Sequence, residues 1–270
     1  MKKRMAALIW MLLMGFAAVA LAEISVTKRD LSLNSELDRN VSNILVILQD
    51  GEKTDALMVA SINSRTGRSV MTRLDTSLEV NVPEAGDVQL GEVYMLGDEK
   101  SRGLLTARTL NTLLNLNIST YVAFDIGRMP ELVEAVGTLN MQLDEQEAEA
   151  LGTWSGLNEM DGEDVLRYVR LSLPGDSPAR SRGYDALMQL LYQGLNSGDL
   201  MGMLGLGTRL LSSMDTNLNP MSAFTLVSAV QGGSDRRELS LPLEEQVTSA
   251  SPLRADAQAM QQTLHKEVYE

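Results

Sequence analysis

The stretch "NILVILQDGEKTDALMVASIN" (residues 43–63) places two acids, Asp50 and Asp55, in a polar bend between two apolar runs. Two carboxylates at this spacing can converge on one hard cation. They can equally well end a strand and flank a turn at Gly51, because acids and glycine are common in surface turns. The sequence leaves both interpretations open.

The residue counts exclude several other kinds of catalytic site. The chain has no cysteine, so it has neither a thiolate nucleophile nor a cysteine metal site. Its single histidine, His265, lies in a segment that we expect to be an exposed helix. A Ser-His-Asp triad is therefore not expected.

The charge balance limits the partners of the chain. The formal net charge of the 270 residues is −13. The first 22 residues contribute three cations and no acid, so the remainder is close to −16. A strongly acidic surface argues against nucleic acid and against anionic lipid headgroups as general partners. Any group of arginines then needs a specific explanation.

The N-terminal segment has the pattern of a secretory signal peptide. Residues 1–22 begin with three cations, continue as an apolar run and end with small residues at Ala20 and Ala22. An uncleaved N-terminal anchor is the alternative, although the run is slightly short for a span of ~20 residues. Both interpretations place the chain from Glu23 onward outside the cytoplasm.

The remaining residues predict a tether followed by one domain. Residues 23–42 are polar and irregular, so we expect a linker there. Residues 43–270 suit a single large domain with a full hydrophobic core.

The first half of this domain alternates between strand-like and helix-like patterns. Short apolar runs bounded by polar bends predict strands, and apolar residues at helical spacing predict helices. The expected strands are residues 43–48, 56–62, 68–74, 119–126 and 139–143. The expected helices are residues 102–116 and 128–137, and residues 81–101 are expected to be a loop. This order indicates an α/β sheet with helices packed on it.

The second half is mostly helical in pattern. The expected helices are residues 161–170, 181–195, 200–214, 219–233 and 256–269. A late strand is expected at residues 236–243.

Six segments in order resemble motifs of one family. They are "NILVILQD", "KTDALMVASIN", "MTRLDTSLEV", "NISTYVAFDIGRMPELVEAVGTLNMQL", "EMDGEDVLRYVRLS" and "SPLRADAQAMQQTLHKEVYE". Their order and spacing over residues 43–270 are similar to those of the LytR-CpsA-Psr family of cell-envelope proteins.

The resemblance implies a fold, a location and an activity. The fold would be an α/β/α sandwich around a central mixed β-sheet. The activity would be phosphotransfer of a glycopolymer from a polyprenyl-pyrophosphate carrier to peptidoglycan, with Mg²⁺ as cofactor. The site would lie at the outer face of the cytoplasmic membrane, in the envelope of a Gram-positive bacterium.

The resemblance also implies roles for individual residues. Asp50 and Asp55 would hold Mg²⁺ beside the pyrophosphate. Asp75 matches the acid of the family's "P-R-D-T" and would orient one of these groups or act as a base. Arg170 matches the first arginine of "Y-x-R-x-R", and Arg182 matches the second arginine of "R-x-x-R-Q". Both would bind the pyrophosphate, and Arg170 would also take part in catalysis.

Several arginines of the family pattern are replaced or displaced. The arginine of "P-R-D-T" is Leu74 here, and Arg73 stands one position earlier. Arg180 stands one position after the first arginine of "R-x-x-R-Q", and the second arginine of "Y-x-R-x-R" is Ser172. A shift of one residue on a strand moves a side chain to the other face. Arg73 and Arg180 are therefore displaced candidates for binding pyrophosphate.

Two functional hypotheses remain open at this point. The preserved acids favour an active phosphotransferase. The missing arginines favour a catalytically degenerate relative that binds a lipid pyrophosphate or acts as a scaffold or regulator in the envelope. A pyrophosphatase acting on the same carrier is a third hypothesis.

Export is directly testable. A fusion of residues 1–42 to alkaline phosphatase, which is active only outside the cytoplasm, should give an active reporter. A matched fusion with Lys2, Lys3 and Arg4 replaced by glutamate should lose most of that activity, because the basic start directs insertion. An inactive, cytoplasmic wild-type reporter would contradict every envelope hypothesis.

Overall fold

The structure is a computed structural model that describes residues 23–31, 33–173, 182–196, 214–218 and 235–270. The helices predicted at residues 200–214 and 219–233 lie almost entirely outside these ranges, as does the predicted signal segment. Within the described ranges, no helix is both long enough and apolar enough to cross a membrane.

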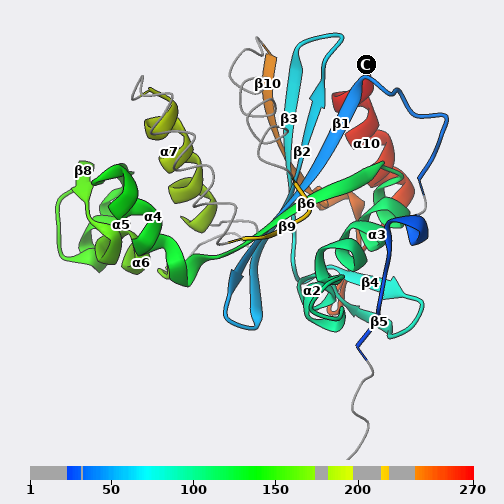
Figure 1. The fold of residues 1–270 in the computed structure, drawn as a ribbon, viewed down its shortest axis with the longest axis horizontal. Helices are drawn as coiled ribbons and strands as arrows, with labels where there is room; N and C mark the ends of the chain where they lie inside the picture. The colour runs from blue at the N-terminus through cyan, green and yellow to red at the C-terminus, as the bar shows by residue number, and fades with distance from the viewer. Residues whose placement is uncertain (1–22, 32, 174–181, 197–213, 219–234) are drawn as a thin grey trace, which may run out of the picture.

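A six-stranded mixed sheet forms the centre of the molecule (Figure 1). Its order is β10-β3-β2-β1-β6-β9. The strands are β1 (Val41–Asp50), β2 (Lys53–Asn63), β3 (Arg68–Leu74), β6 (Ile118–Asp125), β9 (Asp215–Thr216) and β10 (Asp235–Leu241). β2 is antiparallel to β1 and β3, and β9 is antiparallel to β6, whereas β6 is parallel to β1 and β10 is parallel to β3. The mixed sheet is as predicted.

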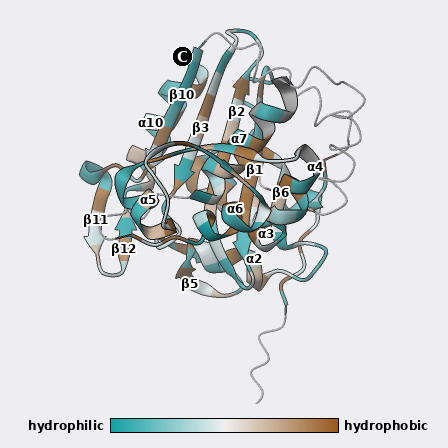
Figure 2. Cartoon of the chain, turned by 90° about the vertical axis from the view of Figure 1, so that its left-hand side faces the viewer, coloured by the Kyte–Doolittle hydropathy of each residue, from teal (hydrophilic) through white to brown (hydrophobic). Residues whose placement is uncertain are grey.

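Apolar runs in the central strands supply both faces of the sheet with core residues. In β1, Leu45 and Ile47 belong to one buried cluster, and Leu48 belongs to the other. A strand that is covered on both faces reads as a continuous apolar run, as β1 does. Figure 2 shows the hydrophobic residues concentrated in these strands, with the edge strand β10 largely hydrophilic.

Helices cover the two faces, which makes an α/β/α sandwich (Figure 1). On one face lie α2 (Val93–Leu96), α3 (Arg102–Leu114) and α10 (Ala257–Tyr269). On the other lie α4 (Met129–Val136), α6 (Gly162–Val169) and α7 (Arg182–Asn196). α3 approaches the sheet closely at Gly103, where a Cβ atom would stand 2.1 Å from the ring of Tyr121. The predicted fold class is confirmed.

A small second sheet stands beside α4 and α6. The strand predicted at residues 139–143 forms as β7 (Leu139–Leu143), but it pairs with β8 (Gly156–Met160) and not with the central sheet. Helix α5 (Glu145–Leu151) connects the two strands. The sequence pattern locates β7 but carries no information on its partner.

The loop predicted at residues 81–101 is wrong. These residues continue a hairpin of β4 (Glu79–Val82) and β5 (Gly86–Gln89), which leads through a short 3₁₀ turn into α2. Gly86 has a φ of +81°, which glycine adopts without strain, and it allows the tight turn between β4 and β5. A further hairpin, β11 (Val247–Ala250) with β12 (Leu253–Ala255), follows β10.

The described part of residues 23–42 is not a free tether. Val26 and Leu31 are buried in the main core, and Ile24 forms a bridge with Gly97. Polar residues outnumber the apolar ones in this segment, so its few buried side chains were easy to miss. The predicted boundary at residue 43 also falls inside β1.

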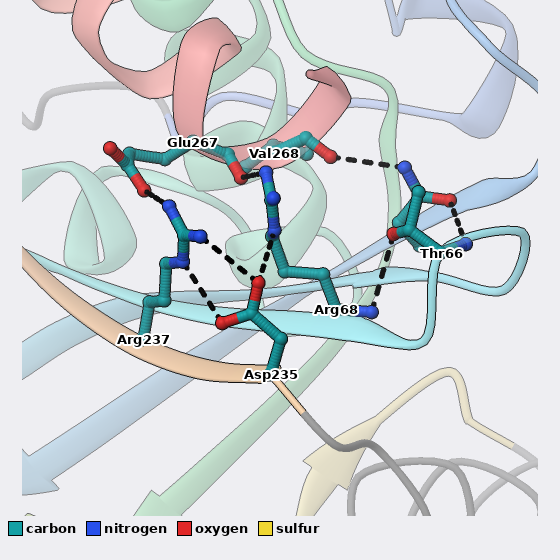
Figure 3. Close-up of polar contacts among 7 residues, drawn as sticks. Thr66, Arg68, Asp235, Arg237, Glu267 and Val268 are labelled. Carbon is teal, nitrogen blue, oxygen red and sulfur yellow. Dashed lines mark hydrogen bonds and ion pairs between the residues drawn. The ribbon is translucent and has the colours of Figure 1, made fainter.

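The C-terminal helix is tied to the far end of the sheet by a network of charges (Figure 3). Asp235 of β10 accepts hydrogen bonds from Arg68 Nε at 2.8 Å and from Arg237 Nε at 3.0 Å. Arg237 also binds the carboxylate of Glu267, and Arg68 donates to the main-chain carbonyl of Glu267. Cations near the last carbonyls of a helix are favourable, so this network fixes α10 and the edge strand β10 together.

Candidate functional site

Four acids lie at one end of the central sheet because of its topology. β1, β3, β6 and β10 run in the same direction, so their carboxyl ends share one edge, and antiparallel β2 begins there. Asp50 and Asp125 end β1 and β6, Asp75 follows β3, and Asp55 lies near the start of β2. Ligands of α/β sheets commonly bind outside the carboxyl ends of the strands.

The bend at residues 50–55 contains a β-bulge that redirects Asp55. Leu48 pairs with Ala56, but Gln49 pairs with Thr54, so Asp55 is the extra residue. Its Oδ2 atom lies 3.3 Å from where a Cβ atom on Gly183 would stand, in the first turn of α7. Bulges re-aim side chains in this way. The carboxylate of Asp55 is therefore on the α7 face of the sheet.

Arg170 and Asp50 meet at the edge of the sheet, although 120 residues separate them. The helix α6 begins at its N-cap Asp161 and brings Arg170 to its C-terminal end. There Arg170 Nη2 donates to Asp50 Oδ1 at 2.8 Å, and both side chains remain partly exposed. The hydrogen bond with Asp50, supported by the charge of Asp125, raises the pKa of Arg170, which thus stays cationic. The structure brings these two predicted residues together.

Asp125 is a site residue that the sequence reasoning missed. It ends β6 opposite Gln49, the neighbour of Asp50, and accepts a hydrogen bond from Gly127 N at 2.8 Å. A Cβ atom on Gly127 would lie 3.0 Å from Asp125 Oδ1 and 3.5 Å from Arg170 Nη2. The signal in the sequence was the position of Asp125 at the end of a strand that could run parallel to β1. The carboxyl ends of parallel strands lie at the same edge of a sheet.

Arg73 lies on the α7 face of the sheet. Its guanidinium is 4.6 Å from the ring centroid of Tyr184 and its Nη2 is 2.9 Å from Glu238 Oε2. Its Nε is buried and has no hydrogen-bond partner among the described residues. Leu74, on the opposite face, is buried in the main core. Because Arg73 stands one position before Leu74, its guanidinium lies on the α7 face of the sheet. A side chain at position 74 points to the opposite face.

Tyr184 and Glu238 form a second group of polar residues together with Arg73. Burial, together with the charge of Glu238, raises the pKa of Tyr184 to about 12. The phenol therefore stays protonated and neutral near pH 7. Its ring face can support the Arg73 guanidinium through a cation–π contact.

Arg182 is enclosed in the protein interior and not presented at the edge. Its Nε donates to Glu147 Oε1 at 2.8 Å, and the two side chains are 4% and 2% exposed. Its Nη1 also donates to the carbonyl of Leu171 at 3.2 Å. This pair joins the start of α7 to α5. The geometry does not support the predicted contact of Arg182 with pyrophosphate, because the Arg182 guanidinium is buried and already paired with the carboxylate of Glu147.

Asp75 closes a turn of its own, and among the described residues no hydrogen bond or ion pair joins it to the Asp50–Arg170 pair. The carboxylate of Asp75 accepts from Ser77 N at 2.9 Å and from Ser77 Oγ at 2.6 Å, which closes the turn after β3. Its predicted role as an orienting group or base therefore remains a prediction. Arg180 lies outside the described residues.

The acids at this edge suit a cation that arrives with its own oxygen ligands. Among the described residues there is no group of three or more acids or histidines able to hold a metal ion alone. Mg²⁺ typically uses one or two protein carboxylates together with phosphate oxygens and water. Asp50 and Asp55, with Asp125 nearby, fit that arrangement and not a closed protein cage.

Comparison with known families decides the relationship. The model of the LytR_cpsA_psr family matches residues 17–268. The chain belongs to the LytR-CpsA-Psr family.

Two curated relatives of this LytR-CpsA-Psr protein are similar over part of their length. A polyisoprenyl-teichoic acid–peptidoglycan teichoic acid transferase, TagU, of Oceanobacillus iheyensis is 24% identical over 144 residues, which are 50% of this chain and 44% of the relative. Biofilm regulatory protein A of Streptococcus mutans is 22% identical over 189 residues, which are 63% of this chain and 46% of the relative. The chain thus spans about half the length of the curated relatives it matches.

Solved structures share the fold. TagT (YwtF) of Bacillus subtilis, solved with bound octaprenyl pyrophosphate lipid, superposes with a TM-score of 0.66 at 17% identity. The match covers 93% of this chain and 98% of that chain. At this identity the likeness establishes the common fold.

The buried pair gives a stability prediction that separates a structural from a substrate-binding Arg182. Removing one member of a buried ion pair leaves an unpaired charge and costs about 3–5 kcal/mol. We expect Arg182→Met and Glu147→Gln each to lower the free energy of unfolding by about this amount, measured by urea denaturation.

The control is Arg167→Met, since Arg167 and Asp164 form an exposed pair on α6. It should change the free energy by less than about 1 kcal/mol. An equally small effect for Arg182→Met would contradict the structural role.

Proposed function

We propose that this chain is a glycopolymer phosphotransferase of the cell envelope. It would take a glycopolymer from a polyprenyl-pyrophosphate carrier and transfer it to peptidoglycan, at the outer face of the membrane of a Gram-positive bacterium. The observation that carries the proposal is the Asp50–Arg170 pair at the carboxyl edge of the sheet, with Asp55, Asp125 and Arg73 on neighbouring strands. The relative named as a teichoic acid transferase, and the TagT structure with a bound lipid pyrophosphate, support the same class.

Arg170 and Arg73 are the cations available for a pyrophosphate. Arg170 is partly exposed, so an incoming diphosphate can replace Asp50 as its partner. Arg73 has a buried Nε that lacks a partner among the described residues, and a buried donor of this kind normally finds one. Each charge-assisted contact contributes roughly 1.5–3 kcal/mol. Two such contacts are enough to position the carrier.

The acids are the groups that would hold Mg²⁺. When Arg170 turns to the diphosphate, the Asp50 carboxylate becomes available beside Asp55. Bound Mg²⁺ would neutralise charge on the phosphate oxygens, which is the main requirement of phosphoryl transfer. Binding of the metal and of the diphosphate should therefore favour each other.

The transfer itself exchanges the phosphoanhydride bond of the carrier for a new phosphoester bond. An acceptor hydroxyl of peptidoglycan would attack the phosphorus that carries the glycopolymer, and the bond to the polyprenyl phosphate would break. The hydroxyl proton would pass to a carboxylate at the edge, for which Asp125 and Asp75 are the candidates. Arg170 would stabilise the charge that develops on the phosphoryl oxygens.

A binding or regulatory role is the second candidate function. Each described arginine of the predicted pyrophosphate set is already matched by an acid of the chain, in the pairs Arg170–Asp50, Arg73–Glu238 and Arg182–Glu147. Charge neutralisation in a transition state would then be incomplete. The relative named biofilm regulatory protein A supports this alternative.

Binding of the carrier tests the role of Arg170. In fluorescence titrations with a labelled polyprenyl pyrophosphate, Arg170→Ala should weaken binding about tenfold to a hundredfold, the equivalent of one charge-assisted contact. Arg167→Ala is the matched control, because Arg167 lies on the same helix and is also exposed. Equal affinities of the two variants would contradict the proposed site. Saturable binding without transfer of a glycopolymer to peptidoglycan would favour the binding role.

Metal binding tests the role of the acids. With the lipid pyrophosphate present, millimolar Mg²⁺ should raise the melting temperature of the wild type by mass action. Asp50→Asn and Asp55→Asn should each remove most of this increase, whereas Glu36→Gln, at an exposed position, should retain it. Identical increases in all the variants would leave Asp50 and Asp55 without a metal role.

A further inference from the structure

The start of β8 and the turn before it expose two large apolar side chains. Trp154 is 71% exposed and Leu157 is 65% exposed, and only two residues lie between them in the chain. Single exposed apolar residues are common. A tryptophan and a leucine so close in the chain are a stronger signal, because tryptophan is enriched at the centres of protein interfaces.

This turn is held in one conformation by a buried asparagine. The side chain of Asn158 donates to the carbonyls of Trp154 at 2.9 Å and Gly156 at 3.0 Å. It also accepts a hydrogen bond from Thr153 Oγ1 at 2.9 Å. Trp154 therefore stands on a pre-organised support, so covering it would cost little backbone entropy.

The strand that follows has an open edge. Among the described residues, β8 pairs only with β7. Asn140 of β7 donates its main-chain N–H to Gln193 Oε1 at 2.6 Å, so it points away from β8. In an antiparallel pair this makes Asn140–Glu159 a non-hydrogen-bonded pair, and Gln142–Leu157 is the next of the same kind. The main-chain N–H and C=O groups of Leu157 and Glu159 thus face the open edge.

The surroundings of this edge are uniformly acidic. Between residues 138 and 164 the sequence has eight acids and no Lys, Arg or His. One of the eight, Glu147, is buried against Arg182. The other seven are Asp144, Glu145, Glu149, Glu159, Asp161, Glu163 and Asp164.

We propose that the open edge of β8 binds an extended, basic segment of a partner protein by strand addition. The main-chain groups of Leu157 and Glu159 would form the hydrogen bonds of the added strand. Their side chains are exposed on one face of β8, while Asn158 and Met160 are buried on the other. Opposite Leu157 the partner places an apolar side chain, and two residues away, opposite Glu159, it places a lysine or arginine.

The charge of this lobe selects the partner. Pairing of two copies through β8 would bring seven acids of one chain against seven of the other. Polyanionic wall polymers and anionic lipid are repelled in the same way. A basic polypeptide gains from the acids and covers Trp154 at the same time. This surface does not include Asp50 or Arg170, so the inference is independent of the proposed phosphotransfer.

Trp154 provides a direct measurement. The chain has two tryptophans, at positions 10 and 154. In full-length Trp10→Phe, the fluorescence of Trp154 can therefore be followed alone. The probe is an eight-residue blocked peptide in which Leu and Lys alternate on one face and Thr fills the other. We expect a saturable blue shift, and no shift with the same peptide carrying Glu in place of Lys.

Two variants separate the edge from the general charge. Glu159→Lys should weaken binding of the basic peptide at least tenfold. Glu149→Lys makes the same charge change in the same acidic segment, but on α5 and not on β8, and should weaken it less than threefold. Both side chains are exposed, so the fold should be retained, which circular dichroism can verify.

Hydrogen exchange tests the predicted main-chain contacts. With peptide bound, exchange of the Leu157 and Glu159 amides should slow at least tenfold, while that of the Asn158 amide should not change. The proposal is overturned by equal binding of the acidic peptide, by unchanged exchange at Leu157 and Glu159, or by a Trp154 shift with anionic vesicles or muropeptides in place of the basic peptide. Self-association of the chain through β8 would also overturn it.

Discussion

The position of β1 between an antiparallel and a parallel neighbour is the constraint on which the site depends. The antiparallel hairpin with β2 returns Asp55 to the same end of the sheet as Asp50, and the parallel pairing with β6 adds Asp125. The bulge opposite Gln49 then turns Asp55 toward α7. Apolar side chains fill the core on both faces of the sheet, and the charges gather at its carboxyl edge. A change of register by one residue would move each of these side chains to the other face.

Electrostatics determines how an acidic chain can hold cations for an anionic ligand. Arginines in such a chain find acids of their own, and the exposure of each pair decides what it can do. The Arg170–Asp50 pair is open to solvent, where ion pairs are weak and exchange partners easily. The Arg182–Glu147 pair is enclosed, so its separation is too costly for ligand exchange. The first pair is suited to binding a ligand, and the second to stabilising the fold.

Local patterns in the sequence were sufficient for the main elements. The apolar runs of β1 to β3, the helical spacing of α3 and α6, and the order of the motifs predicted the sandwich and the family. The pairing of β7 with β8 could not be predicted in this way, because an alternating five-residue strand fits any available edge. The β4–β5 hairpin was not predicted because its turn residues indicated a loop, although Val80 and Val82 are buried. The motifs singled out Asp50 and Arg170, which the structure brings together, whereas the burial of Arg182 depends on Glu147, which no local pattern connects to it.

The network around Asp235 has a consequence for how the chain reaches its folded state. β1, β2 and β3 are neighbours in sequence and can pair as soon as they are made. β10 must join β3 across more than 160 residues, and Arg68 and Arg237 then fasten it to α10. Contacts of such long range form late and slowly. The edge of the sheet at β3 therefore stays open until the C-terminal part of the chain has been synthesised and β10 can pair with it.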